Sequence, residues 1–386
     1  MGGSGRTVTA MSEFRVVVCG GGIAALEGLL RLRRLLGSSV AIDVVAPNDE
    51  LVMRPLAVRQ PFAFGPPSRY ELGRILAGSD ANWLKDTLAW VDREAQVVHT
   101  GDGETLRYDA LLIAVGGRQI DAFEHVTTFR DAEADETYQG VVQDVEGAYS
   151  KSVAFLLPDG PVWPLPLYEL ALMTAERAYS MGIEKLELSL VTPEVSPMAI
   201  FGRAATDAVA GLLERAGITV YLSAVAQVPA AGHVIVQPQG VELHPGRMIA
   251  TPRIAGPGIR GLAGGAAHGF IPIDSACRVP GADARVHAAG DAAAYPVKHG
   301  GLGAQMADTA AASIAQLAGA EVDSKPFLPI IRAKLLTGGA PLYISARLIG
   351  PRGFESEVHD TPPWPQDQKV VAEELGPYLA AVEARE

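Results

Sequence analysis

A glycine-containing motif near the start of the chain has the spacing of a phosphate-binding loop. Gly20-x-Gly22-x-x-Ala25 follows an apolar strand and opens a helix that we predict over residues 23–36. Glycine leaves the backbone amides at the N-terminus of such a helix uncovered, and the helix dipole favours an anion there. The motif predicts a site for the pyrophosphate of a dinucleotide.

A second motif, far along the chain, complements the first. The apolar strand that begins at Val286 ends on Gly290-Asp291. A carboxylate in this position can accept hydrogen bonds from the hydroxyl groups of a bound sugar or polyol chain. Neither motif is specific alone, but the two in this order predict a bound dinucleotide.

The sequence shows no other arrangement that would supply covalent chemistry. Cys19 and Cys277 are the two cysteines, and they lack the Cys-x-x-Cys or Cys-x4-Cys spacing of a dithiol pair. There is no Gly-x-Ser-x-Gly signature and no Cys/His metal spacing, so we expect no metal site. A bound cofactor would therefore have to carry the chemistry.

Composition narrows the class of protein. Of the 386 residues, 48% are hydrophobic and 20% are charged, as in a soluble globular protein of two or three domains. The net charge of −12 opposes contact with nucleic acids, and we expect no nucleic-acid partner. No apolar run reaches the ~18 residues of a transmembrane helix, and two cysteines fit a reducing cytoplasm. Residues 1–13 are predicted to be a disordered leader.

Two βαβ units are predicted, each with the connection length of a parallel sheet. In the first, the helix that follows the opening strand at residues 14–19 leads to a strand at 40–45. The second unit is expected as a strand at 153–157, a helix at 167–181 and a strand at 186–191. We expect a further buried strand at 108–117 and a late helix at 302–318. The strands of the attached antiparallel meanders are expected at 83–92, 96–100, 220–228 and 233–236.

These residues resemble the flavoproteins with two dinucleotide-binding domains, which include pyridine nucleotide-disulfide oxidoreductases, type II NADH dehydrogenases and sulfide:quinone reductases. The resemblance covers residues 14 to about 320. It implies an α/β fold of two Rossmann-like, glutathione-reductase-type βαβ domains with attached antiparallel meanders, and FAD as the cofactor. The implied domains are FAD-binding at 14–120 and 256–324, degenerate NAD(P)-binding-like at 121–255, and a C-terminal cap or interface segment at 325–386.

The resemblance also implies which residues contact FAD. The glycine loop would hold the pyrophosphate, the Gly116 strand looks like the family's Ala-Thr-Gly element, and Asp291 would bind the ribityl chain. Ala46 stands where the family places a ribose-binding acid, and alanine cannot accept a hydrogen bond. Binding of the adenosine would therefore rest on Asn48, Arg54 or backbone groups. The full set of expected cofactor contacts is Gly20, Gly21, Gly22, Ala25, Pro47, Asn48, Arg54, Leu88, Gly116, Gly290, Asp291 and Leu302.

The second unit departs from the family pattern. Where a nicotinamide domain would show another glycine loop, residues 157–166 contain four prolines, which have no amide to offer a phosphate. The strand that ends at Val191 also lacks an acid at its tip. Binding of NAD(P)H is therefore left uncertain.

Three polar residues are candidates for catalytic work at the flavin. Lys298, in a stretch that the family places under the ring, would tune it through its ammonium, and the adjacent His299 would relay protons. Glu169 lies in a segment similar to one that approaches the flavin or quinone end, where a carboxyl of raised pKa would exchange protons with substrate. The alternatives are a solvated lysine, a surface histidine and an acid that complements its helix dipole.

We therefore predict a cytoplasmic FAD-dependent oxidoreductase that passes hydride or electrons between flavin and a small organic substrate or quinone, with NAD(P)H as a possible reductant. The alternatives are a non-catalytic flavin- or nucleotide-binding scaffold or sensor, and a sulfide:quinone reductase-like enzyme with an unusual thiol. Residues 325–354 are apolar and basic without an acidic residue. We expect this segment to cap the flavin or form a homodimer face rather than to contact a membrane peripherally.

Overall fold

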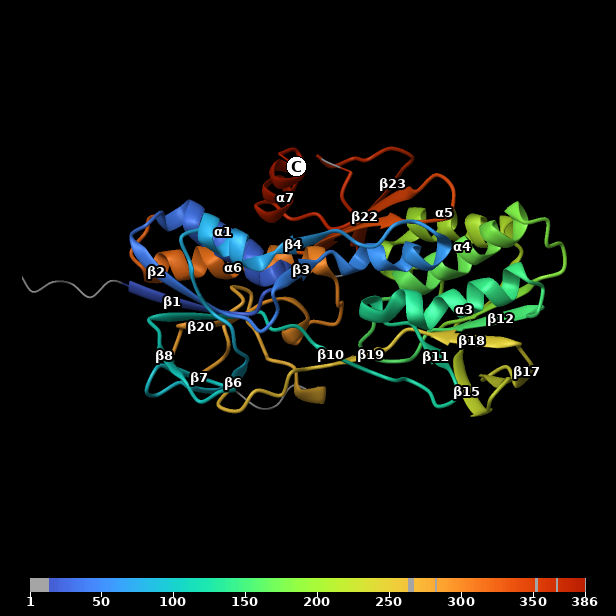
Figure 1. Ribbon diagram of the computed structural model, residues 1–386, viewed down its shortest axis with the longest axis horizontal. Coiled ribbons are helices and arrows are strands. Elements are labelled where there is room, and N and C mark those ends of the chain that lie inside the picture. Colours follow the sequence, from blue (N-terminus) through green and yellow to red (C-terminus); the bar gives the residue numbers. More distant parts are fainter. Residues whose placement is uncertain (1–13, 263–266, 282, 351–352, 366, 386) are drawn as a thin grey trace, which may run out of the picture.

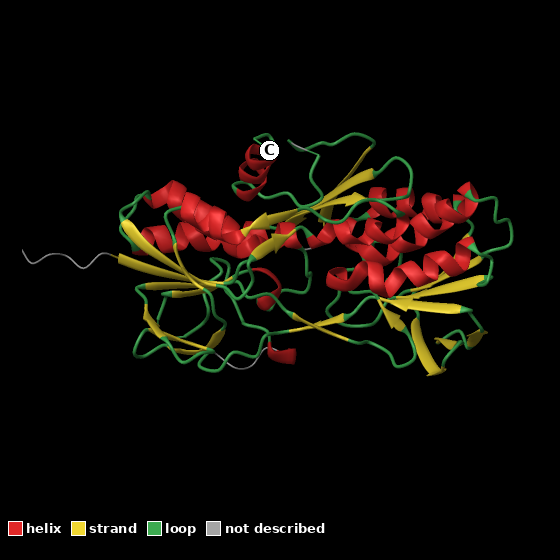
Figure 2. Ribbon diagram, in the orientation of Figure 1, coloured by secondary structure: helices red, strands yellow, loops and turns green. Residues whose placement is uncertain are grey.

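The computed structural model describes residues 14–262, 267–281, 283–350, 353–365 and 367–385, so the predicted leader lies outside the described residues. The chain forms two lobes side by side, each built on a parallel sheet, and the C-terminal part lies across the top of both (Figure 1). Helices cover one face of both sheets, and antiparallel meanders lie on the other (Figure 2).

The first lobe contains a five-stranded parallel sheet in the order β20-β9-β1-β2-β5. Except for the edge strand β5, its strands are largely buried apolar runs, as expected of a parallel sheet covered by other layers. The predicted first βαβ unit is confirmed within its bounds. The elements are β1 (Phe14–Cys19), α1 (Ile23–Leu36), β2 (Val40–Val45), β5 (Asn82–Leu84), β9 (Ala110–Ile113), β20 (Val286–Ala288) and α6 (Gly300–Leu317).

Helices α1 and α6 pack against each other on one face of this sheet, and a three-stranded meander covers the other. The meander consists of β6 (Leu88–Asp92), β7 (Val97–Thr100) and β8 (Thr105–Arg107). The strand predicted over 83–92 is wrong as a single element. Asp86 interrupts it, because its carboxylate accepts the amide of Thr87 at 2.6 Å and that of Asp102 at 3.0 Å. The chain therefore leaves the parallel sheet after β5 and enters the meander at β6.

The second lobe repeats this plan with a sheet in the order β11-β18-β12-β13-β14. The strand predicted over 220–228 is also wrong as a single element. It forms two strands, β14 and β15, and Ser223 between them adopts a left-handed conformation with φ of 47°. The elements are β11 (Thr127–Thr128), α3 (Ala134–Glu146), β12 (Ser152–Leu156), α4 (Leu165–Ser180), β13 (Glu187–Val191), α5 (Arg203–Arg215), β14 (Ile218–Tyr221), β15 (Val225–Ala230), β16 (His233–Gln237), β17 (Val241–Leu243) and β18 (Arg247–Ala250).

Two kinds of segment join the lobes. The chain crosses between them in the antiparallel pair β10 (Arg118–Ile120) and β19 (Arg253–Ala255). The 3-10 helix η1 (Arg54–Phe62), which follows the β3 (Glu50–Val52) strand, reaches from the first lobe to α3 and α4 of the second. Its Phe62 ring lies 5.8 Å from that of Tyr138, so the contact between the lobes is apolar there.

The C-terminal part forms an antiparallel sheet followed by a short helix. The strands are β21 (Ile330–Leu335), β22 (Leu342–Gly350) and β23 (Gly353–His359), and β21 and β23 pack on α4 and α5. The sequence of residues 366–384 predicts a helix interrupted at Gly376-Pro377, but the helix in the structure is shorter. Helix α7 runs from Leu375 to Glu383, and the glycine and proline lie in its first turn, where proline is tolerated. None of the described helices is long and apolar enough to cross a membrane.

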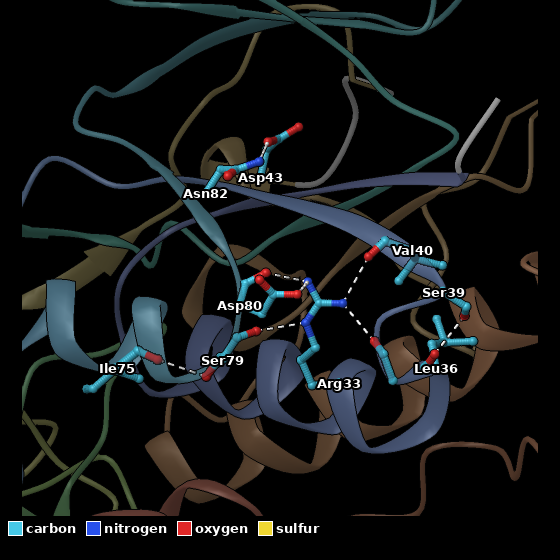
Figure 3. A network of polar contacts seen from close by, with 10 residues as sticks. Arg33, Leu36, Ser39, Val40, Asp43, Ile75, Ser79, Asp80 and Asn82 are labelled. Atoms are coloured by element: carbon cyan, nitrogen blue, oxygen red, sulfur yellow. Dashed lines mark hydrogen bonds and ion pairs between the residues drawn. The ribbon is translucent and has the colours of Figure 1, made fainter.

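Arg33 closes the C-terminal end of α1 onto its neighbours (Figure 3). Its guanidinium donates to the carbonyl oxygens of Gly37 at 2.7 Å, Val40 at 2.9 Å and Ser79 at 2.7 Å. Asp43 is nearly buried and accepts the amide of Asn82 on β5 at 2.9 Å. This carboxylate therefore ties β2 to β5 in the body of the sheet and is turned away from the strand ends.

Two buried carboxyl groups lie where α1, α6 and the C-terminal segment meet. Glu27 accepts the backbone amides of Glu374 at 2.9 Å and Leu375 at 2.6 Å, which anchors the start of α7. Burial and the neighbouring Glu27 raise the pKa of Asp308 to about 9, so at neutral pH Asp308 is protonated and can donate to Glu27.

We predict that Asp308→Asn stabilises the protein increasingly as pH rises. The raised pKa of Asp308 means that folding takes up a proton, so the wild-type protein loses stability between the ordinary carboxyl pKa and about 9. An amide donates to Glu27 without titrating, and the variant should gain about 2 kcal/mol on the wild type between pH 5 and pH 9. Urea unfolding at several pH values measures the difference. Asp323→Asn, at an exposed acid, should show no such trend.

Candidate functional site

The carboxyl ends of four strands in the first sheet form one edge, and the polar and glycine positions predicted from the sequence gather there. Gly22 follows β1, Asn48 follows β2, Gly116 follows β9 and Asp291 follows β20. Gly22, Pro47 and Asn48 are exposed, whereas Gly116 and Asp291 are half-buried. In doubly wound sheets, ligands bind in the crevice outside this edge.

The glycine loop provides an open helix N-terminus in this crevice. Gly20 makes the turn: its φ is 130°, its amide donates to Val45 at 2.8 Å, and a Cβ there would lie 2.3 Å from the Ala114 carbonyl oxygen. Gly22 caps α1 without a side-chain hydrogen bond, and a Cβ there would meet nothing within 4 Å. The space over Gly22 therefore fits an anion, held by amides that no side chain covers. Ala25 is buried beneath the loop.

Lys298 and Asp291 lie at the far end of the same edge, beyond β20. The buried Lys298 ammonium donates to the carbonyl oxygens of Ala293 at 2.7 Å and Asp291 at 3.2 Å, and it lies 3.6 Å from the centre of the Phe270 ring. Burial lowers the pKa of Lys298 to about 8, and the Asp291 carboxylate opposes that shift. Burial also raises the pKa of Asp291, against the effect of Lys298.

A cavity of about 180 Å³ opens between the lobes beside these residues. His299, which begins α6, is buried with its ring 4.6 Å from that of Trp163, and its Nδ1 has no hydrogen-bond partner among the described residues. Burial lowers the pKa of His299 to about 4, so the ring is neutral at physiological pH. The polar and aromatic residues of the wall are Arg54, Gln119, Phe129, Asp131, Trp163, Thr251, Asp291, Lys298, His299 and Lys369.

Glu169 is placed behind the cavity wall and not in it. It is wholly buried in α4, where its carboxylate accepts two contacts from Lys369 Nζ, at 2.5 and 2.6 Å, and the amide of Leu336 at 2.9 Å. Burial raises the pKa of Glu169, and the Lys369 ammonium opposes this. Lys369 lines the cavity, so any proton that Glu169 exchanges with a ligand has to pass through Lys369.

A second cavity of about 300 Å³ lies on the other side of the 369–370 segment. It shares Pro55, Lys369 and Val370 with the first cavity, and its other walls come from η1, the C-terminal segment, Ile23 of α1 and the chain at Ser68 and Tyr70. Lys334 pairs with Asp367 at 2.6 Å in this wall, and Arg59 has a buried Nε without a partner among the described residues. The second cavity therefore has charged walls, and one strip of chain at Lys369 and Val370 borders both cavities.

The corresponding edge of the second sheet is closed. Glu194, three residues past β13, accepts the hydroxyl of Tyr168 at 2.6 Å and that of Thr192 at 3.1 Å, so it is turned inward. Burial raises the pKa of Glu194. The proline-containing loop places Trp163 in the first cavity. Thr251, the residue after the end of β18, has a buried hydroxyl without a partner among the described residues.

The remaining predicted residues are divided between the crevice and its surroundings. The family resemblance implies a place near the adenosine for Arg54, and in the structure Arg54 lines the cavity with Lys298. Leu88 is half-buried in the meander, within the apolar cluster of Val45. Leu302 is buried in α6.

Several residues of the first cavity were not predicted from the sequence, among them Lys369 and Thr251, and neither cysteine contributes to the cavity. Lys369 and Thr251 carry no motif, and only the fold brings them to the site. Cys19 and Cys277 are fully buried, and burial raises the pKa of each thiol to about 12. Neither thiol lines either cavity.

We predict that Lys369→Met destabilises the protein by about 3 kcal/mol, because it leaves the buried Glu169 carboxylate without its counter-charge. Adding Glu169→Met to this variant should recover most of the loss, since a buried pair replaced by apolar groups of similar size costs little. Chemical denaturation of the two variants measures both effects. A double variant less stable than Lys369→Met would contradict this account.

Comparison with known proteins shows the fold. No family model matches the chain. Among solved structures, the sulfide:quinone oxidoreductase of the hyperthermophilic bacterium Aquifex aeolicus has a TM-score of 0.79 at 19% identity, over 90% of this chain and 87% of that one. A ferredoxin reductase from Rhodopseudomonas palustris has a TM-score of 0.63 at 18% identity, over 89% of this chain and 88% of that one.

An NAD-dependent persulfide reductase from A. fulgidus is similar as well. Its TM-score is 0.61 at 17% identity, over 88% of this chain, which spans 65% of the length of that protein. The chain therefore shares the fold of these proteins. This confirms the predicted α/β fold class of two Rossmann-like domains.

Proposed function

We propose that the protein is an FAD-dependent oxidoreductase that passes hydride or electrons between flavin and a small organic substrate or quinone. The observation that carries this proposal is the placement of the open N-terminus of α1 at Gly22, Asp291 and Lys298 along one edge of the first sheet, with Asp291 and Lys298 also lining the cavity between the lobes. Similarity to solved oxidoreductases of the same fold supports it.

The described residues fit FAD. The amides at Gly21 and Gly22 would hold the pyrophosphate, Asp291 would accept the ribityl hydroxyls, and the exposed Pro47 and Asn48 would border the adenosine. Bound there, FAD would supply two-electron redox chemistry that the side chains lack.

The side chains of the first cavity would position a substrate and control charge and protons. The ammonium of Lys298 favours negative charge that develops beside it, and it does so fully only below its pKa of about 8. The neutral His299 ring has a free Nδ1, and the Thr251 hydroxyl is also free to bond a ligand. Trp163 and Phe129 would contact the faces of a planar organic molecule.

The two cavities suggest separate places for an electron donor and an electron acceptor. They share Lys369, whose ammonium is backed by the buried Glu169 carboxylate, so one proton-exchanging pair borders both. A quinone takes up two protons with two electrons, and such a pair can deliver protons. The similarity to a sulfide:quinone oxidoreductase supports a quinone as the acceptor.

NADH or NADPH is the less favoured reductant in this proposal. The first cavity, at about 180 Å³, is small for a dinucleotide. At the edge of the second sheet, prolines stand where a phosphate-binding loop would need backbone amides, and Glu194, which could otherwise bind a ribose, is hydrogen-bonded to Tyr168. A small organic donor fits this geometry better.

We predict that Gly22→Asp abolishes FAD binding without destabilising the fold. Aspartate is a favourable helix N-cap, so the free energy of unfolding of the apoprotein should be equal or higher, whereas its charge would oppose the pyrophosphate. The flavin absorbance of the purified protein and titration of the apoprotein with FAD measure binding. Gly22→Asn, which has a similar shape without the charge, should bind FAD at least tenfold more tightly than Gly22→Asp.

Equal FAD affinity in the two Gly22 variants and the wild type would contradict the placement of the pyrophosphate. A wild-type protein that purifies without flavin and takes up none would remove the basis of the proposed function.

We predict that Lys298→Met lowers the rate of flavin reduction by a small organic donor by about 10²-fold, the usual effect of losing one electrostatic stabiliser. In the wild type the rate should fall as pH rises through about 8, because the Lys298 ammonium then loses its proton. The Met variant should lack this pH dependence, and Lys298→Arg should retain the rate at high pH. Stopped-flow absorbance at the flavin band measures these rates.

The same mixing experiment separates the alternatives. Rapid reduction by NADH or NADPH would make the nicotinamide nucleotide the donor. Tightly bound flavin that no donor reduces, in wild type and variants alike, would instead favour a flavin-binding scaffold or sensor.

A further inference from the structure

Two histidines and a glutamate share one face of the hairpin formed by β16 and β17 in the second lobe. In this hairpin Val234 pairs with Leu243, and Val234 is fully buried in the apolar cluster beneath. Because alternate residues of a strand point to opposite faces, His233 faces outward. On the facing strand, Glu242 and His244 also point outward, so the antiparallel register brings the three side chains together.

The distances among these groups are short. His233 Nε2 lies 3.3 Å from a carboxylate oxygen of Glu242, and His244 Nε2 lies 4.0 Å from the same oxygen. The two imidazole rings stack, with centres 4.9 Å apart and planes 24° apart. One nitrogen or oxygen atom from each residue lies within 4.8 Å of the others.

We propose that His233, Glu242 and His244 form a site for a divalent transition metal such as Zn²⁺. Two imidazole nitrogens and one carboxylate oxygen are zinc ligands, and three protein ligands with a water molecule complete a tetrahedral ion. Ligand atoms of such an ion lie about 3.4 Å apart, as metal–ligand bonds of about 2.0–2.1 Å require. His244 and Glu242 are 69% and 60% exposed, so their side chains are free to rotate over this short distance.

The ligand set also determines which metal binds. Imidazole nitrogen favours Zn²⁺, Cu²⁺ and Ni²⁺, whereas Mg²⁺ and Ca²⁺ prefer oxygen ligands in larger number. The sequence predicts no metal site, because it contains no Cys/His metal spacing. The three residues come together through the register of the hairpin, and their spacing along the sequence does not reveal this register.

The site lies at the outer end of the second lobe, near β15 and β17 and far from the crevice of the first sheet (Figure 1). A metal there would cross-link two neighbouring strands of the meander that covers the apolar cluster of Val234 and Val236. We infer a structural role in which the ion stabilises this meander, independent of the proposed redox function.

Isothermal titration of the EDTA-treated, dialysed full chain with Zn²⁺ alone tests the proposal. The expected result is one ion per chain with a dissociation constant in the micromolar range, a rise in the melting temperature, and no binding of Mg²⁺. His244→Asn should weaken Zn²⁺ binding at least tenfold and remove the rise in melting temperature, and Glu242→Gln should weaken binding severalfold.

His125→Asn, at an exposed histidine of the same lobe outside the cluster, is the control and should bind Zn²⁺ as the wild type does. The proposal is overturned if His244→Asn binds with the same stoichiometry and affinity as the wild type, which would indicate an adventitious ion only. Failure to bind Zn²⁺ up to millimolar concentration would also overturn it. Neither outcome bears on flavin binding, which the Gly22 variants test separately.

Discussion

The open N-terminus of α1 is the feature on which the rest of the first lobe depends. Parallel strands bring their carboxyl ends to one edge, so the turn at Gly20 places the amide of Gly22 beside the ends of β2, β9 and β20. A side chain at Gly20 would strike the Ala114 carbonyl, so the turn exists only with glycine there. Asp291 and Lys298 could contact the same ligand as the glycine loop only because all of them lie along this one edge.

The C-terminal segment is part of the site and not an appendage to it. Glu27 on α1 holds the start of α7, and Glu169 on α4 holds Lys369, so two buried carboxylates from different lobes fix the same segment. The strip from Lys369 to Val370 then separates the two cavities. A buried carboxylate is costly without its partner groups, so each of these two contacts makes the cavity walls depend on the packing of both lobes.

The parts of the structure that local signals encode were predictable, and the parts that depend on distant contacts were not. The valine-rich strand, glycine loop and helix of the first unit follow from apolar runs and turn chemistry, and they occur at their predicted bounds. The split of the 83–92 strand depends on hydrogen bonds of the Asp86 side chain, and hydrophobic pattern alone cannot show these. Lys369 and Thr251 reach the cavity through tertiary packing, and no spacing in the sequence marks them.

The second sheet shows how one fold gives its two strand edges different uses. At the first edge, glycine leaves amides and space for a diphosphate. At the second, prolines remove donors, the Tyr168 hydroxyl binds Glu194 inward, and Trp163 projects into the cavity between the lobes. An edge built in this way has fewer backbone donors for a second diphosphate, and its Trp163 forms part of the wall of the first cavity. In the proposed function, the first edge would hold the cofactor and the second would border the substrate.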